Sequence, residues 1–210
     1  MKATRNDRIA YLQLLEEKRR REAFNDLNAY CRYIDMPSAP VNDDEDCEQF
    51  YVDSVTPSAH HILLNDALMR VECGDIQRLL VMMPPGSAKS TYGTVAFPTW
   101  FIGRKRGRSV ITTGYGDSLS QKFSRKSRQI TKSEKYNEIF NTGLLKGNES
   151  AHSWELENGS ALMAAGLLSG LTGNRTDGLI IDDPVKGRED ADSPTTVSYT
   201  HLTLPTKRIV

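Results

Sequence analysis

An apolar run that leads directly into a lysine-bearing loop constrains this chain more than any other stretch. Residues 78–83, RLLVMM, have the pattern of a fully buried strand. They are followed by PPGSAKS at residues 84–90 and by a helical pattern over residues 91–103, which Pro98 should kink or shorten. A strand, a loop and a helix in this order can turn backbone N–H groups toward an anion. The stretch therefore predicts a phosphate-binding loop.

The loop departs from the usual pattern G-x-x-x-x-G-K-[ST]. Lys89 and Ser90 are present, but Met83 and Ala88 stand at the two glycine positions. A positive φ at Ala88 would cost on the order of 1 kcal/mol, which a loop can tolerate. Taken alone, the loop fits either a nucleotide site or an ordinary connection that happens to contain Lys-Ser. In the first interpretation the nucleotide is held by Pro85, Gly86, Ser87, Ala88, Lys89, Ser90 and Thr91.

A second element favours the nucleotide site. Residues 178–184, GLIIDDP, form an apolar strand that ends in Asp182 and Asp183. A carboxylate at the carboxyl end of a buried strand can orient Mg²⁺ at the phosphates of a bound nucleotide. A strand that simply ends in a turn is the alternative for this element alone. Both elements in one chain favour the nucleotide site.

The rest of the chain supports an α/β sheet. A second buried strand is expected at residues 109–114, a helix at 118–131, and a hairpin over 153–166 that turns at Asn158-Gly159. Buried strands that alternate with helices predict a mostly parallel sheet flanked by helices.

The N-terminal part reads differently. Residues 5–33 predict one helix, which carries the basic cluster Lys18–Arg21, either a solvated face or a DNA-backbone contact. An acidic loop follows, in which residues 43–46 are more typical of solvated side chains than of a metal site. A helix from Ser58 to about Glu72 should end at Gly74.

Composition sets broad limits. The 210 residues are 38% hydrophobic and 26% charged, as in a soluble globular protein, and the formal net charge is zero. Any nucleic-acid contact must therefore come from local basic clusters. No apolar run approaches the roughly 20 residues that a membrane span needs, and the N-terminus lacks the apolar stretch of a signal peptide.

The segments MMPPGSAKSTY and GLTGNRTDGLIIDDPVKGREDADS resemble the large terminase subunit of tailed bacteriophages, over about residues 57–195. The resemblance implies a P-loop NTPase fold of the RecA/ASCE type, incomplete here, with an N-terminal helical extension. It implies ATP and Mg²⁺ as cofactors and an ATPase motor that moves double-stranded DNA into a procapsid. Terminases are known for deviant phosphate loops, so the missing glycines agree with it.

Residue roles follow from the same resemblance. Lys89 would bind the β and γ phosphates, Ser90 and Asp182 would hold Mg²⁺, and Asp183 would activate water. Many terminase loops contain an arginine where this chain has Gly86-Ser87. Arg175 is our substitute candidate, in cis or toward a neighbouring subunit, with a surface arginine as the alternative. His60 and His61 stand where an adenine contact would lie, or they cap a helix.

The implied partners are double-stranded DNA, a portal protein, a small terminase subunit and further copies in a ring, without a membrane. The implied location is the bacterial host cytoplasm and, transiently, the procapsid portal. The full-length protein would also be an endonuclease, with that part outside this chain. Two alternatives stay open: a helicase-like DNA translocase, and a non-catalytic DNA-binding or assembly module.

We expect three regions: an N-terminal helix and acidic loop at 1–56, a partial ATPase domain at 57–195, and a non-native tail at 196–210. The tail contains VSYTHLTLPT, which back-translates into a transposon-end sequencing adapter. A real edge strand is the alternative, because Val, Tyr and Thr favour strands.

Overall fold

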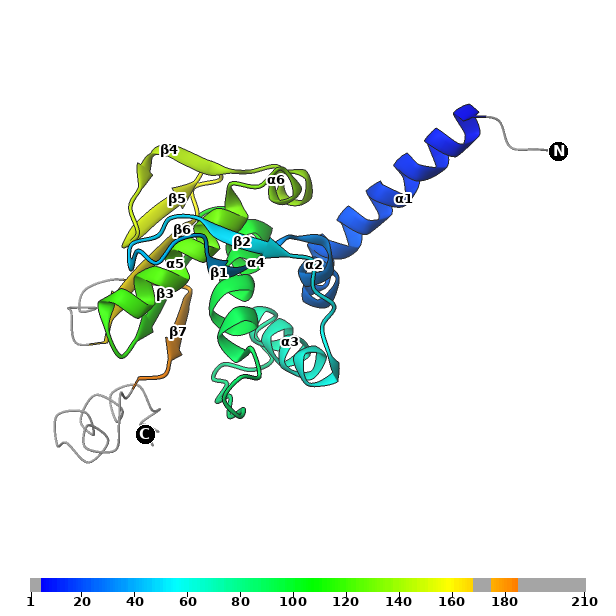
Figure 1. Cartoon of the computed structure of the whole chain (residues 1–210). Coiled ribbons are helices and arrows are strands. Elements are labelled where there is room, and N and C mark those ends of the chain that lie inside the picture. Colours follow the sequence, from blue (N-terminus) through cyan, green and yellow to red (C-terminus); the bar gives the residue numbers. More distant parts are fainter. Residues whose placement is uncertain (1–4, 168–174, 185–210) are drawn as a thin grey trace.

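A five-stranded sheet forms the centre of the fold in the computed structural model, which describes residues 5–167 and 175–184 (Figure 1). Its order is β4 (Leu144–Glu149), β5 (Ser153–Leu156), β6 (Ala161–Gly166), β3 (Ser109–Gly114) and β7 (Gly178–Asp182). Strand β3 lies parallel to both β6 and β7, whereas β4, β5 and β6 are antiparallel neighbours. The α/β class is confirmed, but the sheet is mixed rather than mostly parallel. The hairpin at Asn158-Gly159 makes β5 and β6 antiparallel, and β4 extends that half.

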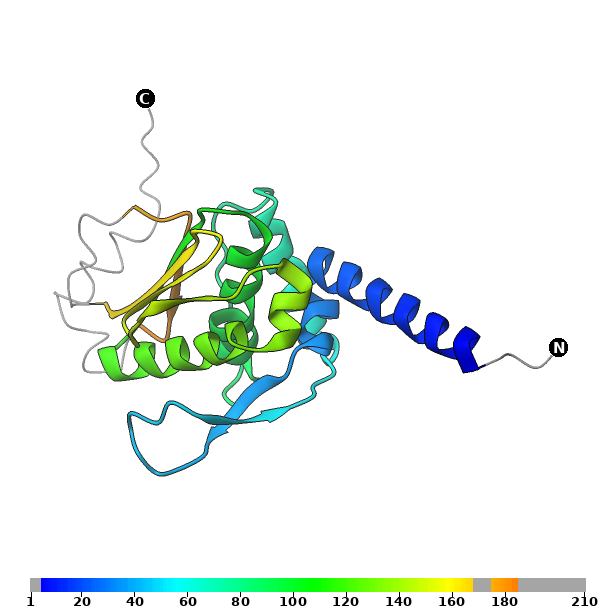
Figure 2. The same ribbon diagram turned by 90° about the horizontal axis from the view of Figure 1, so that it is seen from above.

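Helices α4 (Phe97–Arg104) and α5 (Asp117–Thr131) pack side by side against one face of the sheet (Figure 2). Trp154 is fully buried between these layers, and Trp100, also fully buried, donates from its Nε1–H to the Ala23 carbonyl of the N-terminal helix at 3.1 Å. The Trp154 Nε1–H donates to the Ser124 hydroxyl of α5 at 3.0 Å, so its one polar atom is satisfied. The short helix α6 (Glu134–Phe140), which was not predicted, follows α5, and its Tyr136 hydroxyl donates to the Thr99 carbonyl of α4 at 2.9 Å. These layers fix the strand ends from which the candidate site is built.

The prediction of a buried strand at residues 78–83 was wrong. This run has no strand assignment, and Leu80 and Met82 are 80% and 86% exposed. Leu79, Val81 and Met83 pack against the core instead, so the run alternates between core and solvent. A strand needs a hydrogen-bonded neighbour, and among the described residues no strand pairs with this run.

The helical segment after the loop begins as a π-helix. Residues Thr91–Ala96 form η1, and α4 continues directly from it with Pro98 in the first turn. Proline lacks an N–H and is tolerated in the first turn of a helix but not in the interior. The helix type changes just before Pro98, and the kink itself stays a prediction. A π-helical turn is also a frequent companion of functional sites.

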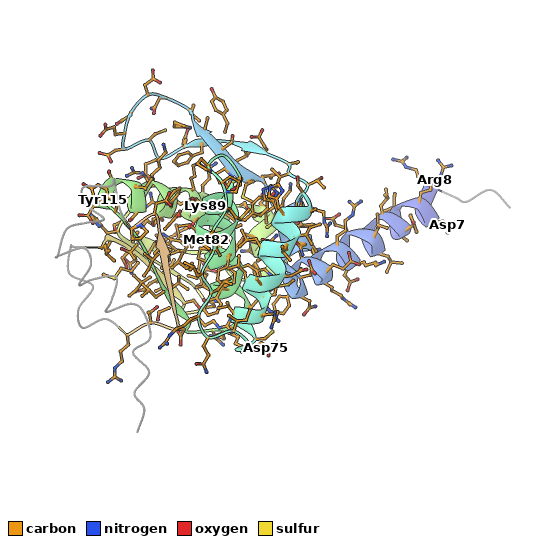
Figure 3. All side chains as sticks on the ribbon, turned by 90° about the horizontal axis from the view of Figure 1, so that it is seen from below. Asp7, Arg8, Asp75, Met82, Lys89 and Tyr115 are labelled. Carbon is orange, nitrogen blue, oxygen red and sulfur yellow. The ribbon has the colours of Figure 1, made fainter. Side chains whose placement is uncertain are left out.

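The predicted N-terminal helix is two helices. Helix α1 (Arg5–Asn25) projects from the body, with Asp7 and Arg8 at its far end, and α2 (Leu27–Tyr33) packs against α3 and α4 (Figures 1 and 3). The break lies at Asp26, whose backbone is extended and whose side chain accepts a hydrogen bond from the Ala29 N–H at 2.7 Å. An Asp that caps a new helix start competes with helix continuation. Within the described residues, no helix is long and apolar enough to cross a membrane.

Between α2 and α3 the chain forms an unpredicted two-stranded ribbon of β1 (Met36–Pro40) and β2 (Phe50–Asp53). The acidic loop joins these strands and is held on α5 by ion pairs, Arg125 to Asp46 at 3.1 Å and Arg128 to Glu48. Both arginine side chains are buried. Helix α3 (Ala59–Glu72) starts after Ser58 as predicted, and Gly74 follows it with φ +86°.

Candidate functional site

The loop of residues 84–90, here called the Lys89 loop, adopts a tight turn before η1. The Ser87 N–H donates to the Pro84 carbonyl at 3.3 Å. Gly86 has φ +78° and Ala88 has φ +56°. Ala88 is therefore in the left-handed region, at a cost on the order of 1 kcal/mol for a residue with a Cβ. A strained non-glycine residue at the glycine position shows that the surrounding structure imposes this backbone shape.

Lys89 extends from this loop to the carboxyl end of β7. Its Nζ lies 2.6 Å from Asp183 Oδ1, although the two residues are far apart in sequence. The hydrogen bond to Asp183 raises the pKa of Lys89, so the amine is charged at neutral pH. Asp183 is 59% exposed and has φ +42°, and its carbonyl accepts from the Tyr115 N–H at 3.2 Å. The structure thus brings Lys89 and Asp183 together at one edge of the sheet.

Asp182 has a different environment from Asp183. It is 8% exposed, and its Oδ2 accepts a hydrogen bond from the Thr94 hydroxyl of η1 at 3.0 Å. It sits beside Gly114, the last residue of β3. The two consecutive carboxylates therefore have separate partners, Thr94 inside and Lys89 at the surface.

A cavity of about 460 Å³ lies against the Lys89 loop. It is lined by Met83, Pro84, Pro85, Gly86, Ser87, Ala88, Lys89, Ser90, Thr91 and Asp183. Every loop residue that the sequence predicts for phosphate binding lines it, whereas Asp182 does not. Among the described residues the buried Ser87 hydroxyl has no hydrogen-bond partner, and a buried polar atom of this kind usually has one, such as a ligand or a water. The size, the lysine and the free hydroxyl fit the phosphates of a nucleotide.

The chain's own side chains would not enclose a metal ion here. Among the described residues, no group of three or more His, Cys, Asp or Glu side chains is placed to hold one. Mg²⁺ usually takes only one or two carboxylates and completes its shell with phosphate oxygens and water. Ser90 and Asp182 fit that donor chemistry, so the expected Mg²⁺ would depend on the nucleotide.

Arg175 does not join this group. Its carbonyl accepts from the Ser109 hydroxyl at 3.4 Å, at the amino end of β3. Lys89 and Asp183 lie at the opposite, carboxyl end of the parallel pair of β3 and β7. An arginine finger in cis therefore does not fit this placement. The side chain is exposed, so the alternative of a contact with a neighbouring subunit stays a hypothesis. The Gly-rich residues 168–174 before it lie outside the described residues.

Two contacts of the site were not predicted from the sequence. Thr94 stands one helical turn after Ser90, and that i, i+4 relation could have indicated a hydroxyl on the same face. His61 contacts the Lys89 loop itself: its Nε2 lies 2.9 Å from the Ser87 carbonyl oxygen. His60 and His61 open α3, as the capping alternative expected, and only His61 has a hydrogen bond to the loop among the described contacts.

Replacing Thr94 by valine should lower the free energy of unfolding by about 1–3 kcal/mol, because the buried Asp182 carboxylate loses a hydrogen-bond donor. Valine keeps the β-branched shape, so the helix is otherwise little affected. Urea denaturation of wild type and variant measures the difference. Thr94→Ser keeps the hydroxyl and is the matched control. Equal stability of the valine variant and wild type would show that the Thr94–Asp182 contact contributes nothing.

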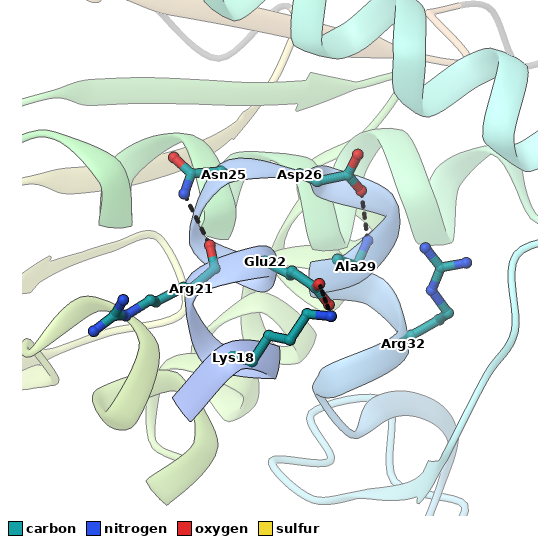
Figure 4. Close-up of a pocket in the computed structure, with 7 residues that line it drawn as sticks. All are labelled: Lys18, Arg21, Glu22, Asn25, Asp26, Ala29 and Arg32. Carbon is teal, nitrogen blue, oxygen red and sulfur yellow. Dashed lines mark hydrogen bonds and ion pairs between the residues drawn. The ribbon is translucent and has the colours of Figure 1, made fainter. Parts of the chain in front are cut away.

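A second cavity, also about 460 Å³, lies at the junction of α1 and α2 (Figure 4). It is lined by Lys18, Arg21, Glu22, Asn25, Asp26, Ala29 and Arg32. Lys18 pairs with Glu22 at 3.7 Å, and Arg21 pairs with Glu17 on the same helix. Exposed pairs of this kind contribute little and are compatible with a solvated helix face. The DNA-contact alternative for this basic cluster stays open.

Fold and site together define an α/β domain in which a lysine-bearing loop meets the Asp183 carboxylate at the carboxyl edge of a mixed sheet. The family described as "Terminase large subunit, T4likevirus-type, N-terminal" matches residues 80–199, which is more than half of the chain. The chain therefore belongs to this family of large terminase subunits, and membership supports a role in packaging phage DNA. A search of curated proteins finds no match.

The family match begins inside the RLLVMM run and includes both the Lys89 loop and Asp182-Asp183. It favours a terminase over the helicase-like alternative. It ends at residue 199, slightly inside the segment 196–210 that the sequence analysis assigns to a non-native tail. That tail lies outside the described residues, so its origin stays a hypothesis.

Proposed function

We propose that this chain is the ATPase motor part of a DNA-packaging terminase, with a P-loop NTPase fold. The observation that carries the proposal is the Lys89–Asp183 contact, which joins the two sequence elements at one cavity. A lysine and a carboxylate from distant segments, at the carboxyl edge of an α/β sheet and beside a helix N-terminus, suit an anionic ligand. Family membership supports the DNA-packaging role.

The chain's residues can take distinct tasks in hydrolysis. Lys89 would leave Asp183 and bind the outer phosphates, where its charge offsets the negative charge of the transition state. The released Asp183 would then accept a proton from, or orient, the attacking water. Ser90 and Asp182 would hold Mg²⁺, which would supply positive charge against the phosphates. Thr94 keeps Asp182 oriented.

The remaining assignments follow from the family role and belong to the same proposal. Double-stranded DNA is the cargo, and a portal protein and a small terminase subunit are the partners, in the bacterial cytoplasm and at the procapsid. Several copies would form a ring, in which the exposed Arg175 could reach a neighbouring copy's nucleotide. The full-length protein would also cleave DNA.

The test is phosphate release by the purified full-length protein with ATP and Mg²⁺. We expect steady turnover that EDTA abolishes and that restored Mg²⁺ recovers, because among the described residues Lys89 is the one cationic side chain that lines the cavity, and a nucleotide's phosphates carry more charge than one lysine offsets. The same rate with and without EDTA would contradict the metal assignment. A folded protein that neither binds nor hydrolyses ATP would support the non-catalytic alternative instead.

A further inference from the structure

One imidazole ties together three elements around the Lys89 loop. His61 Nδ1 accepts a hydrogen bond from the Ser58 backbone N–H at 3.1 Å, and its Nε2 lies 2.9 Å from the Ser87 carbonyl oxygen. The ring also stacks on Tyr92 of η1, with centroids 4.1 Å apart and planes 22° apart. His61 therefore joins the start of α3, the loop and the helix that follows it.

The partners of His61 determine where its proton lies. A backbone N–H can only donate, so Nδ1 must be the acceptor at Ser58. The neutral ring then carries its proton on Nε2 and donates it to the Ser87 carbonyl. Both partners are main-chain groups, so substitutions at Ser58 and Ser87 side chains would not remove them. The ring therefore links the backbone at Ser58 to the backbone at Ser87.

This contact also determines the direction of the next amide. In a trans peptide the carbonyl of one residue and the N–H of the next point in opposite directions, and the described residues contain no cis peptide bond. Because the Ser87 carbonyl points to His61, the Ala88 N–H points away from α3. Ala88 lines the cavity and has φ +56°. Successive backbone N–H groups in such turns form concavities that bind anions.

We propose that His61 is a positioning residue that orients the Ala88 amide toward a nucleotide phosphate by holding the Ser87 carbonyl. This role rests on the proposed ATPase function and differs from an adenine contact, since it acts through the loop backbone. It also accounts for the strained backbone at Ala88. The hydrogen bond from His61 to the Ser87 carbonyl holds the Ser87–Ala88 peptide in place and so opposes a change of φ at Ala88.

The experiment compares His61→Phe and His61→Gln in the full-length protein. Phenylalanine keeps a ring against Tyr92 but has no acceptor for Ser58 and no donor for Ser87. We expect it to raise KM for ATP about tenfold, the effect of losing one oriented hydrogen bond, with kcat little changed. We expect KM to change without kcat because the Ala88 amide would bind the phosphate equally well in the ground state and in the transition state. Glutamine offers an acceptor and a donor on one planar group and is the usual partner in such a helix cap, so it should recover most of the affinity.

His152→Phe is the matched control, because His152 is exposed on the turn before β5 and bonds to Gln121 rather than to the loop. Melting temperatures of all variants separate a loss of fold from a loss of affinity. An unchanged KM in folded His61→Phe, a glutamine variant as weak as the phenylalanine variant, or an equal effect of His152→Phe would each overturn the proposal. Absence of wild-type turnover would instead overturn the proposed function, and this inference with it.

Discussion

Replacing Lys89 by alanine should lower ATP turnover by the full-length protein at least about a hundredfold. The ammonium group would otherwise lie against the outer phosphates, where negative charge moves in the transition state, and removal of one such stabilising group costs about two to three powers of ten. Steady-state phosphate release measures the effect. Near-normal turnover in the alanine variant would refute the site assignment.

Lys105→Ala is the matched control for this experiment. Lys105 is exposed on the turn that leads into β3, at the amino end of the sheet, so it carries the same charge far from the Lys89 loop. We expect wild-type turnover from it. A similar loss in both variants would indicate a general dependence on positive charge, for instance through DNA, rather than a role at the nucleotide.

The ion pair with Asp183 does not prevent Lys89 from reaching a phosphate. The two side chains are 31% and 59% exposed, and pairs exposed to this degree contribute only about 0–1 kcal/mol. A nucleotide phosphate carries more charge than one carboxylate and can displace it at little cost. The pair therefore keeps Lys89 directed across the cavity before the ligand binds.

Local signals explain which parts of the fold could be predicted. The Asn158-Gly159 turn, the start of α3 at Ser58 and the buried run of β3 depend on nearby residues, and the structure contains all three. The ribbon of β1 and β2 depends instead on contacts with α5, such as the hydrogen bond from the Phe50 N–H to Gln129 at 2.8 Å. Pairing across such a distance leaves no periodic trace in the sequence.

Residues 78–83 also show that strand pairing cannot be predicted from a local sequence. Their apolar composition correctly indicates contact with the core through Leu79, Val81 and Met83. Composition cannot show which strand would pair with them, and their backbone forms no ladder with the described strands. An apolar run in a sequence thus predicts contact with the core more reliably than it predicts a strand of a sheet.

Some residues of the candidate site could likewise be predicted from sequence motifs, and others could not. Lys89 and Asp183 could be expected together because each belongs to a motif associated with a nucleotide's phosphates or its metal ion, although the structure has no strand directly before the Lys89 loop. Arg175 was placed near them only because it precedes β7, but the strand carries it to the other end of the sheet. The contacts of Thr94 and His61 depend on side-chain directions that motifs do not specify.

Asp182→Asn should retain nucleotide binding but lower Mg²⁺-dependent turnover about a hundredfold or more, because a metal ion contributes several kcal/mol of charge stabilisation. Asparagine has nearly the same shape and keeps an oxygen that can accept from the Thr94 hydroxyl, so the fold around β7 should survive. The substitution removes only the negative charge that would attract the ion. Nucleotide titration and phosphate release at several Mg²⁺ concentrations measure the two effects separately.

Asp177→Asn is the control at the opposite end of the same strand. Asp177 Oδ2 accepts from the Ser109 N–H at 2.8 Å, and asparagine can keep that bond, so turnover should stay at the wild-type level. Asp182 is buried and absent from the lining of the cavity, whereas the exposed Asp183 lines it, so Asp183→Asn is needed to test the assignment of the metal to Asp182. Intact turnover in Asp182→Asn, together with loss of Mg²⁺ dependence in Asp183→Asn, would move the metal role to Asp183. Loss in Asp182→Asn that higher Mg²⁺ reverses in part, beside a loss in Asp183→Asn that Mg²⁺ does not reverse, would place the ion at Asp182 and leave Asp183 its role with the attacking water.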